Sequence, residues 1–274
     1  MDAESLKLRL NGGTGAWWNV IYLESTDSTN TAARRAAEAG SGEGTVIVAD
    51  TQTAGRGRMG RTWFSPPSKG VWLSALIRPR VRSEQLGIIS ISAAVAAVEG
   101  IRKATGIRAG IKWPNDLLLD GRKVCGILTE SCIAGQSAGL VTVGVGVNVF
   151  QSMSDFPGEL ADRAISLQEY REEAILDRTM IAGAIIGEIG AYCIDCIPHE
   201  IRGNMDKWRQ YCVMFGKTVE VTSGGGKAVR GVASDIDDEG ALVVRTDDGS
   251  SIHVVSGEAS VLYPIKKEVN CPGH

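Results

Sequence analysis

A glycine- and arginine-rich segment between two predicted strands limits the folds open to this chain most strongly. Residues 55–61 read Gly-Arg-Gly-Arg-Met-Gly-Arg, which satisfies G-x-G-x-x-G and also resembles a phosphate loop with Arg61 in place of lysine. Both motifs need a helix to begin at the last glycine, so that its N-terminus binds phosphate. Pro66 and Pro67 follow closely, and proline does not continue a helix beyond its first turn. The sequence therefore argues against both nucleotide-binding folds.

The same segment is typical of a loop that binds anions. Its guanidinium groups, on Arg56, Arg58 and Arg61, offer planar, paired donors to carboxylates and phosphates. Glycine lets the backbone adopt left-handed conformations and lie close against a ligand. Because like charges this close repel one another, we expect the loop to be mobile until an anion neutralises it. The alternative is a solvated turn between strands.

A second polar cluster follows a short predicted strand. Residues 112–116 read Lys-Trp-Pro-Asn-Asp, and Lys123 lies beyond a predicted Asp-Gly turn. Because the proline ends the regular strand, the Asn/Asp pair lies at a strand end. We expect Lys112 and Lys123 on the two sides of one hairpin, where they and the Asn115/Asp116 pair bind a polyphosphate and its magnesium. The alternative is an ordinary turn with two exposed lysines.

A third segment, residues 144–148, reads Gly-Val-Gly-Val-Asn. Small residues on one face of a strand indicate that a flat ligand or another backbone approaches closely. A bulge or tight side-chain packing is the alternative.

Hydrophobic periodicity predicts two parts of the chain. The first has a helix at residues 29–39, strands at 44–50 and 70–77, a helix at 84–104, a β-meander at 109–149 and helices at 177–196 and 200–213. Four or five short strands follow between residues 217 and 264, at the spacing typical of a small barrel. We therefore expect a catalytic domain over residues 1–214 and a C-terminal domain over residues 215–274.

Composition excludes several classes of protein. The 274 residues carry 29 Lys+Arg and 32 Asp+Glu, a net charge of −3, which argues against general binding to nucleic acid or anionic lipid. No apolar run reaches the length of about 18 residues that a membrane span needs, and the first 27 residues do not resemble a signal peptide. Six cysteines in a chain of this size are expected to be free thiols. We therefore expect a cytoplasmic protein.

The cysteine and histidine positions favour packing over chemistry. Cys193, Cys196 and His199 have the ligand types for zinc, but a structural site usually needs a fourth ligand. The favoured interpretation is that these positions continue the apolar face of a helix. The three histidines have no nucleophile or acid partner in an obvious motif, so a histidine-based triad is poorly supported.

At these motifs the sequence resembles the biotin protein ligases. The resemblance covers about residues 20–150 and extends to the terminal strands. The matching segments, in the order found in the family, are residues 27–30, 52–58, 63–66, 112–117, 122–123, 126–128 and 144–148.

The resemblance implies a two-step reaction and an α+β fold. Biotin and MgATP give biotinyl-5'-AMP and pyrophosphate, and a lysine of a biotin carboxyl carrier protein, such as that of acetyl-CoA carboxylase, then takes the biotin. The implied catalytic domain is a mixed β-sheet flanked by helices, similar to class II aminoacyl-tRNA synthetases, and the implied C-terminal domain is a small β-barrel.

The resemblance also implies roles for individual residues. Arg58 and Lys123 would be catalytic, and Asp116 would hold Mg²⁺. The residues implied for biotin are Ser28, Thr29, Asn30, Gln52, Gly55, Arg56, Gly57, Arg58, Trp63, Lys123 and Gly126. Those implied for ATP are Arg58, Arg61, Trp63, Lys112, Asn115, Asp116, Lys123 and Asn148.

Two departures from the family pattern affect what we expect. Met59 occupies a loop position that is often basic, which leaves one fewer cation. Residues 17–20 already read as the first catalytic strand, whereas a winged helix needs about 60 residues. We therefore expect a ligase without a DNA-binding domain, with no membrane partner, as a monomer or homodimer.

Two other functions remain open. A lipoate-type ligase on the same fold would differ in the pocket for the tail of the substrate. An RNA-binding module would use the Gly/Arg loop with neighbouring aromatics, although such a module needs a basic face.

Overall fold

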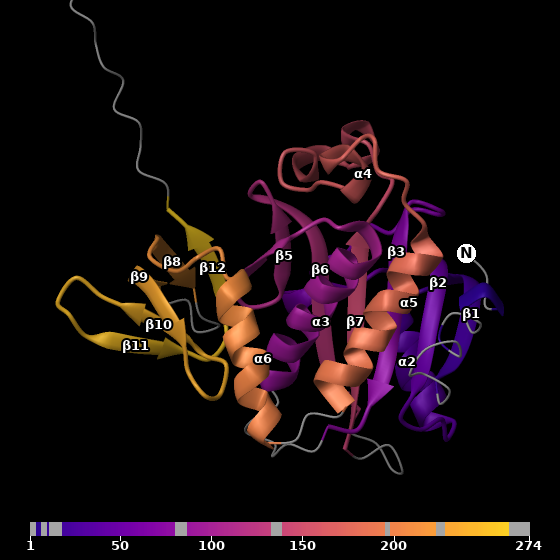
Figure 1. The fold of residues 1–274 in the computed structure, drawn as a ribbon, viewed down its shortest axis with the longest axis horizontal. Coiled ribbons are helices and arrows are strands. Elements are labelled where there is room, and N and C mark those ends of the chain that lie inside the picture. The colour runs from indigo at the N-terminus through magenta and orange to yellow at the C-terminus, as the bar shows by residue number, and fades with distance from the viewer. Residues whose placement is uncertain are drawn as a thin grey trace, which may run out of the picture.

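The computed structural model describes residues 4–6, 10, 18–79, 87–132, 139–194, 198–222 and 228–262. They form a large mixed sheet with helices on both faces and a smaller antiparallel sheet beside it (Figure 1). The expected α+β class is confirmed.

Seven strands form the large sheet in the order β1-β2-β3-β7-β6-β5-β4. The β1–β2 pair is parallel and the other pairs are antiparallel, which makes the sheet mixed. The strands are β1 (Asn19–Thr26), β2 (Thr45–Gln52), β3 (Gly70–Ile77), β4 (Gly110–Lys112), β5 (Asp116–Leu119), β6 (Arg122–Cys132) and β7 (Leu140–Asn148).

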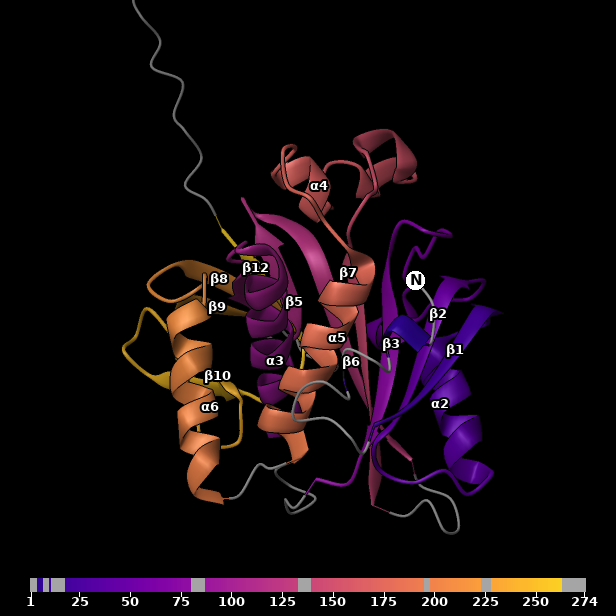
Figure 2. The same ribbon diagram turned by 45° about the vertical axis from the view of Figure 1, so that its right-hand side comes forward.

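Helices cover both faces of this sheet because successive strand side chains point to opposite sides. Val46 and Val48 of β2 belong to the main core, which also includes the buried face of α3, whereas Ile47 packs with Ala33 and Ala37 of α2 on the other face. In Figures 1 and 2, α3, α5 and α6 lie side by side across the main-core face. The helices are α2 (Thr29–Glu38), α3 (Gly87–Thr105), α4 (Leu167–Tyr170), α5 (Arg178–Ile189), a π-helical turn η6 (Gly190–Ile194) and α6 (Pro198–Tyr211).

Within the described ranges, no helix combines the length and the apolar character needed to cross a bilayer.

The C-terminal strands form one antiparallel sheet in the order β11-β10-β9-β8-β12. Among the described residues, the pairings leave β11 and β12 as edges, so the expected small barrel is observed as an open five-stranded sheet. Its strands are β8 (Thr218–Thr222), β9 (Ala228–Ile236), β10 (Leu242–Arg245), β11 (Ser251–Val254) and β12 (Glu258–Val261).

The two sheets meet around a buried tryptophan. Trp113, between β4 and β5, is 1% exposed, and its Nε1 donates a hydrogen bond of 3.1 Å to the carbonyl oxygen of Gly240, in the turn between β9 and β10 of the C-terminal sheet. Val213, after α6, donates its N–H to the carbonyl oxygen of Ile111 at 3.0 Å. The C-terminal sheet is thus packed directly behind the Lys-Trp-Pro-Asn-Asp segment.

An irregular segment after β7 was not expected from the sequence. It contains two 3₁₀ turns, η4 (Met153–Asp155) and η5 (Gly158–Leu160), before the single-turn helix α4. Its residue Ala164 forms an isolated parallel bridge with Lys123, in which Lys123 N lies 2.7 Å from the Arg163 carbonyl oxygen. This segment lies at one end of the sheet (Figures 1 and 2).

Candidate functional site

A cavity of about 620 Å³ opens beside the start of α2, over β6 and β7. Its walls also come from the Gly/Arg loop, the β4–β5 hairpin, residues 156–164 and residues 257–260 of the C-terminal sheet. The sequence-predicted residues that line it are Ser28, Thr29, Asn30, Gln52, Arg56, Gly57, Arg58, Arg61, Trp63, Lys112, Asn115, Asp116, Lys123, Gly126 and Asn148.

Gly55 is the predicted site residue that does not line this cavity. A Cβ at Gly55 would lie 2.4 Å from the Trp63 carbonyl oxygen, and Trp63 N donates to the Gly55 carbonyl oxygen at 2.9 Å. Gly55 therefore closes the base of the loop, outside the cavity lining.

The Gly/Arg loop folds back on itself without starting an α-helix. After β2 ends at Gln52, the loop contains one 3₁₀ turn, η1 (Arg58–Gly60), and an isolated bridge between Arg56 and Thr62. Met59 and Gly60 have φ values of 55° and 74°, so the chain turns through the left-handed region that glycine favours. The rejection of the two helix-dependent nucleotide motifs is confirmed.

Carboxylates from distant segments hold two of the loop arginines. Arg56 Nη2 lies 2.6 Å from Glu130 Oε1, and Arg61 makes a bidentate pair with Glu258, at 2.8 and 3.0 Å. The bond from Arg61 holds the pKa of Glu258 below its ordinary value. Two of the three loop charges are thus compensated by carboxylates of the protein itself.

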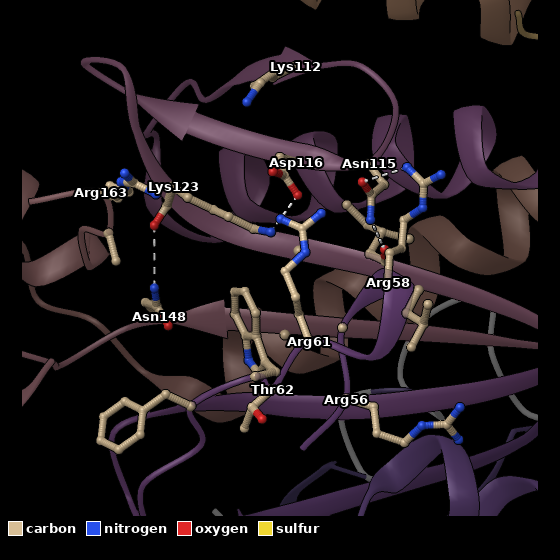
Figure 3. Close-up of a pocket in the computed structure, with 18 of the residues that line it drawn as sticks. Arg56, Arg58, Arg61, Thr62, Lys112, Asn115, Asp116, Lys123, Asn148 and Arg163 are labelled. Atoms are coloured by element: carbon tan, nitrogen blue, oxygen red, sulfur yellow. Dashed lines mark hydrogen bonds and ion pairs between the residues drawn. The ribbon is translucent and has the colours of Figure 1, made fainter. Parts of the chain in front are cut away.

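Arg58 differs from these two arginines. In Figure 3 the guanidinium of Arg58 lies beside Asn115, whereas the side chain of Arg56 points away from Lys123. Arg58 Nη1 lies 3.4 Å from Asn115 Oδ1. Burial lowers the pKa of Arg58, which still leaves a guanidinium charged at neutral pH. A cation that is partly removed from water acts strongly on a nearby anion.

Lys123 is paired with Asp116 across neighbouring strands. Its Nζ lies 2.5 Å from Asp116 Oδ1 and 5.1 Å from the ring centroid of Trp63 (Figure 3). Lys112 and Lys123 were expected on the two sides of one hairpin, which is wrong: Lys112 ends β4, Lys123 lies in β6, and β5 separates them. Residues 116–119 form this separating strand because they pair with β4 on one edge and with β6 on the other.

The side-chain amides of the two asparagines predicted for ATP are largely occupied by backbone groups. Asn115 Nδ2 donates to the Ile127 carbonyl oxygen at 2.5 Å. Asn148 is 3% exposed, and its Nδ2 lies 3.2 Å from the Ile165 carbonyl oxygen and 3.4 Å from that of Lys123. Asn148 therefore joins β7 to the irregular segment beside Lys123.

The strand glycines accommodate side chains of the protein itself. A Cβ at Gly144 would lie 2.1 Å from Asn30 Oδ1, and a Cβ at Gly146 would lie 2.4 Å from Trp63 Nε1. Gly126, which pairs with Gly146, also leaves room for the Trp63 ring. The tight-packing alternative for residues 144–148 is therefore the one observed. These glycines leave room for Asn30 and Trp63, two residues of the cavity wall.

Several residues of the site were missed from the sequence. Glu130 and Glu258 hold the loop arginines, buried Ser74 bonds to Asn30, and Phe156 and Arg163 line the cavity from the irregular segment. Each is a single residue far along the chain from the motif it contacts, so no local spacing pointed to it.

The cysteines that the structure describes form no metal site. Among the described residues, no group of three His, Cys, Asp or Glu side chains could hold a metal ion. Cys193 is buried in the main core, and the side chains of Cys196 and His199 lie outside the described residues. Burial raises the pKa of the Cys125 and Cys212 thiols, that of Cys212 to about 11.

Comparison with known proteins identifies this arrangement. A family model described as "Biotin/lipoate A/B protein ligase family" matches residues 22–148, and one described as "Biotin protein ligase C terminal domain" matches residues 214–262. The biotin--[acetyl-CoA-carboxylase] ligase of Mycobacterium tuberculosis is 34% identical over 261 residues, which cover 93% of each protein. The chain belongs to the biotin protein ligase family.

Other members of the biotin protein ligase family support the same assignment. The bifunctional ligase/repressor BirA of Bacillus subtilis is 38% identical over 84% of this chain and 70% of its own length. The structure of the Aquifex aeolicus biotin protein ligase in complex with biotin and ATP has a TM-score of 0.75 and 27% identity, covering 90% of this chain and 99% of that chain.

Proposed function

We propose that this chain is an ATP-dependent ligase that activates biotin as biotinyl-5'-AMP and transfers it to a lysine of a biotin carboxyl carrier protein. The observation that carries the proposal is that one cavity brings Lys123 and Arg58 together with the walls predicted for biotin and for ATP. Its volume of about 620 Å³ lies within the usual range for small-molecule sites.

The first step joins two anions, which explains the cationic lining. A carboxylate oxygen of biotin attacks the α-phosphorus, an O–P bond forms, and the bond to the bridging oxygen breaks to release pyrophosphate. Cations next to both groups reduce their repulsion and stabilise the charge that builds up on the phosphoryl oxygens. Lys123 and Arg58 are the cations we assign to this step, with Arg61 and Lys112 beside them on the cavity wall.

Magnesium enters this site with ATP as part of the substrate. Mg²⁺ is commonly bound by one or two carboxylates together with substrate phosphates, and keeps several waters. We assign Asp116 as the protein carboxylate for it. Asp116 suits this role because it lines the cavity and lies next to Lys123, so a phosphate held by the lysine would be within reach of the same metal.

The second step needs no nucleophile from the ligase. The acceptor lysine of the carrier protein attacks the acyl carbon, AMP leaves, and the amine loses a proton. The one cysteine next to the site, Cys125, is fully buried, and burial raises the pKa of its thiol, so it remains protonated at neutral pH. We infer that Gly57, Arg58 and Trp63 of the loop wall keep water from the mixed anhydride between the steps.

The remaining predicted roles follow the walls of the cavity. We assign the biotin head to the wall formed by Ser28, Thr29, Asn30 and Gln52, and the adenine to the side of Trp63. We also propose that residues 1–214 form the catalytic domain and residues 215–274 the C-terminal domain, since α6 ends at Tyr211 and β8 begins at Thr218.

Mass spectrometry of a biotin carboxyl carrier domain, incubated with biotin, MgATP and this protein, tests the proposal. We expect one biotinyl group on the carrier, dependent on ATP. The lipoate alternative is not favoured, because the relatives at least 30% identical that we compared are biotin ligases. Addition of a lipoyl group in a parallel reaction with lipoate, and none with biotin, would contradict the proposal.

A further inference from the structure

A chain of buried hydrogen bonds connects Glu130 on β6 to the cavity wall at Thr29. Asn30 Nδ2 lies 2.8 Å from Glu130 Oε2, and Ser74 Oγ lies 2.6 Å from Asn30 Oδ1 and 2.7 Å from Thr29 Oγ1. Ser74 is fully buried, and Asn30 and Thr29 are 5% and 4% exposed. Thr29 lines the cavity, whereas Ser74 does not. The hydrogen-bonding capacity of each group fixes the proton positions in this series of hydrogen bonds.

The Glu130 end determines the orientation of the Asn30 amide. The group of Asn30 that faces Glu130 also lies 3.2 Å from the Leu128 carbonyl oxygen. A carboxylate and a carbonyl oxygen only accept, so this group must be the NH₂. The amide oxygen of Asn30 therefore faces Ser74. Arg56, which lies 2.6 Å from the other Glu130 oxygen, keeps that carboxylate in place.

Ser74 transmits this orientation to Thr29. A serine hydroxyl has one proton, and the amide oxygen of Asn30 has none, so the short Ser74–Asn30 contact uses the serine proton. The Thr29–Ser74 contact must then use the proton of the threonine hydroxyl. Gln52 Oε1, at 3.1 Å from Thr29 Oγ1, is a second and longer acceptor for the same hydroxyl proton, and it also receives the Thr29 backbone N–H at 2.8 Å.

The consequence lies at the cavity wall. With its proton directed to Ser74, the Thr29 hydroxyl presents only lone pairs to a ligand. We propose that Ser74 and Glu130 are positioning residues that make Thr29 an obligatory hydrogen-bond acceptor, so that this wall selects a ligand N–H over a ligand carbonyl. The cyclic urea of biotin carries two such N–H groups. This inference rests on the proposed function. It specifies that the cavity wall assigned to biotin accepts hydrogen bonds from the ligand at Thr29.

A double-mutant cycle on Ser74 and Thr29 tests the inference. The KM for biotin and the KM for ATP are measured by pyrophosphate release for the wild type, Ser74→Ala, Thr29→Val and the double variant. Without Ser74, the threonine proton is free to turn toward Gln52 or the cavity. We expect Ser74→Ala to raise the KM for biotin about fivefold, the value of one hydrogen bond.

The cycle separates a positioning role from a structural one. In the Thr29→Val background, Ser74→Ala should change the KM for biotin less than about twofold, because the hydroxyl that it orients is already absent. The KM for ATP should stay the same throughout. Ser92→Ala is the matched control, since Ser92 is equally buried, in α3, and bonds to Asn204. It should leave the KM for biotin unchanged.

Equal effects of Ser74→Ala in both backgrounds, or no effect in either, would overturn the inference while the ligase activity stands. Absence of biotin-dependent pyrophosphate release from the wild-type chain would instead overturn the proposed function on which the inference rests.

Discussion

Asp116 Oδ1 holds the ammonium of Lys123 at 2.5 Å, across the two strands β5 and β6. Both side chains are partly buried, with 22% and 32% of their surface exposed. The pair holds the Lys123 ammonium at a fixed place in the cavity. The Asp116 carboxylate compensates its charge until substrate anions take the place of that carboxylate. The proposed first step depends on this arrangement, because the lysine must be available to two anions together.

The role of Asn30 in biotin binding can be tested by filling the space that Gly144 leaves for its side chain. In Gly144→Ala the new methyl would lie 2.1 Å from Asn30 Oδ1, so Asn30 must move and the hydrogen bond to Ser74 must stretch. We expect a KM for biotin raised about tenfold or more, since at least one buried hydrogen bond is lost. Steady-state pyrophosphate release at varied biotin concentration measures it.

Gly187→Ala is the control for this substitution. Gly187 lies in α5, and a Cβ there would contact nothing within 4 Å. Alanine should stabilise the helix by about 0.5–1 kcal/mol and leave the KM for biotin unchanged. A normal KM for biotin in Gly144→Ala would show that Asn30 does not take part in biotin binding.

Arg58 should retain the activated biotin in the cavity. Removing its guanidinium in Arg58→Gly opens the wall between Asn115 and solvent and removes a partly buried cation from the phosphate. We expect adenylation to fall by about tenfold to a hundredfold and the escaping anhydride to label lysines of an unrelated protein. Labelling of serum albumin, compared with labelling of a carrier domain, measures the loss of specificity. Specific labelling of the carrier alone would contradict this role.

Glu258 should restrain the Gly/Arg loop through Arg61. The pair is bidentate but exposed, so its contribution is about 0.5–1 kcal/mol. We expect Glu258→Gln to increase the rate of tryptic cleavage within residues 56–61 about twofold to fivefold. Glu220→Gln, on the neighbouring strand β8, controls for loss of one carboxylate. Equal cleavage rates in the two variants would show that Arg61 is not held by the C-terminal sheet.

The Asp27–Arg35 pair supports the start of α2 in a pH-dependent way. Bidentate bonding to Arg35, at 2.8 and 2.9 Å, lowers the pKa of Asp27 from 3.8 to about 2. Because the folded-state pKa is the lower one, the stabilisation is present above pH 3.8 and is lost as the pH falls toward 2. Asp27 is 41% exposed, so the effect should stay below about 1 kcal/mol.

Urea unfolding at about pH 5 and about pH 3 tests this pair. The stability of the wild type should fall more steeply between the two values than that of Asp27→Asn. Asp238→Asn, at an exposed turn, is the control and should follow the wild type. Parallel curves for wild type and Asp27→Asn would contradict the assignment.

Much of the fold could be predicted because it follows from local patterns. Short apolar runs rich in β-branched residues indicated β2, β3 and β7, and the prolines after the Gly/Arg loop correctly argued against a helix. The irregular segment 149–177 could not be predicted, since its short turns carry no periodicity. The placement of Lys112 and Lys123 on one hairpin was wrong because the four-residue strand β5 pairs with both β4 and β6 and so separates the two lysines.

The site was predictable in its motifs and not in its supports. The predicted site residues other than Gly55 line one cavity, whereas Glu130, Glu258 and Ser74 belong to no recognisable sequence motif. Their roles follow from strand order, which places β3 and β6 on either side of β7 and brings β12 to the loop. That long-range pairing is a property of the tertiary structure.

The most direct test of the central claim is biotin-dependent exchange of pyrophosphate into ATP by Lys123→Gln. Glutamine keeps a polar side chain that is one bond shorter than that of lysine. The substitution removes the positive charge that we place between the two reacting anions. We predict that the rate of exchange falls by about 10²–10³-fold, which is the usual effect of removing one group that stabilises charge in the transition state. The control variant Lys217→Gln should exchange at the wild-type rate. Exchange by Lys123→Gln at the wild-type rate would contradict the account.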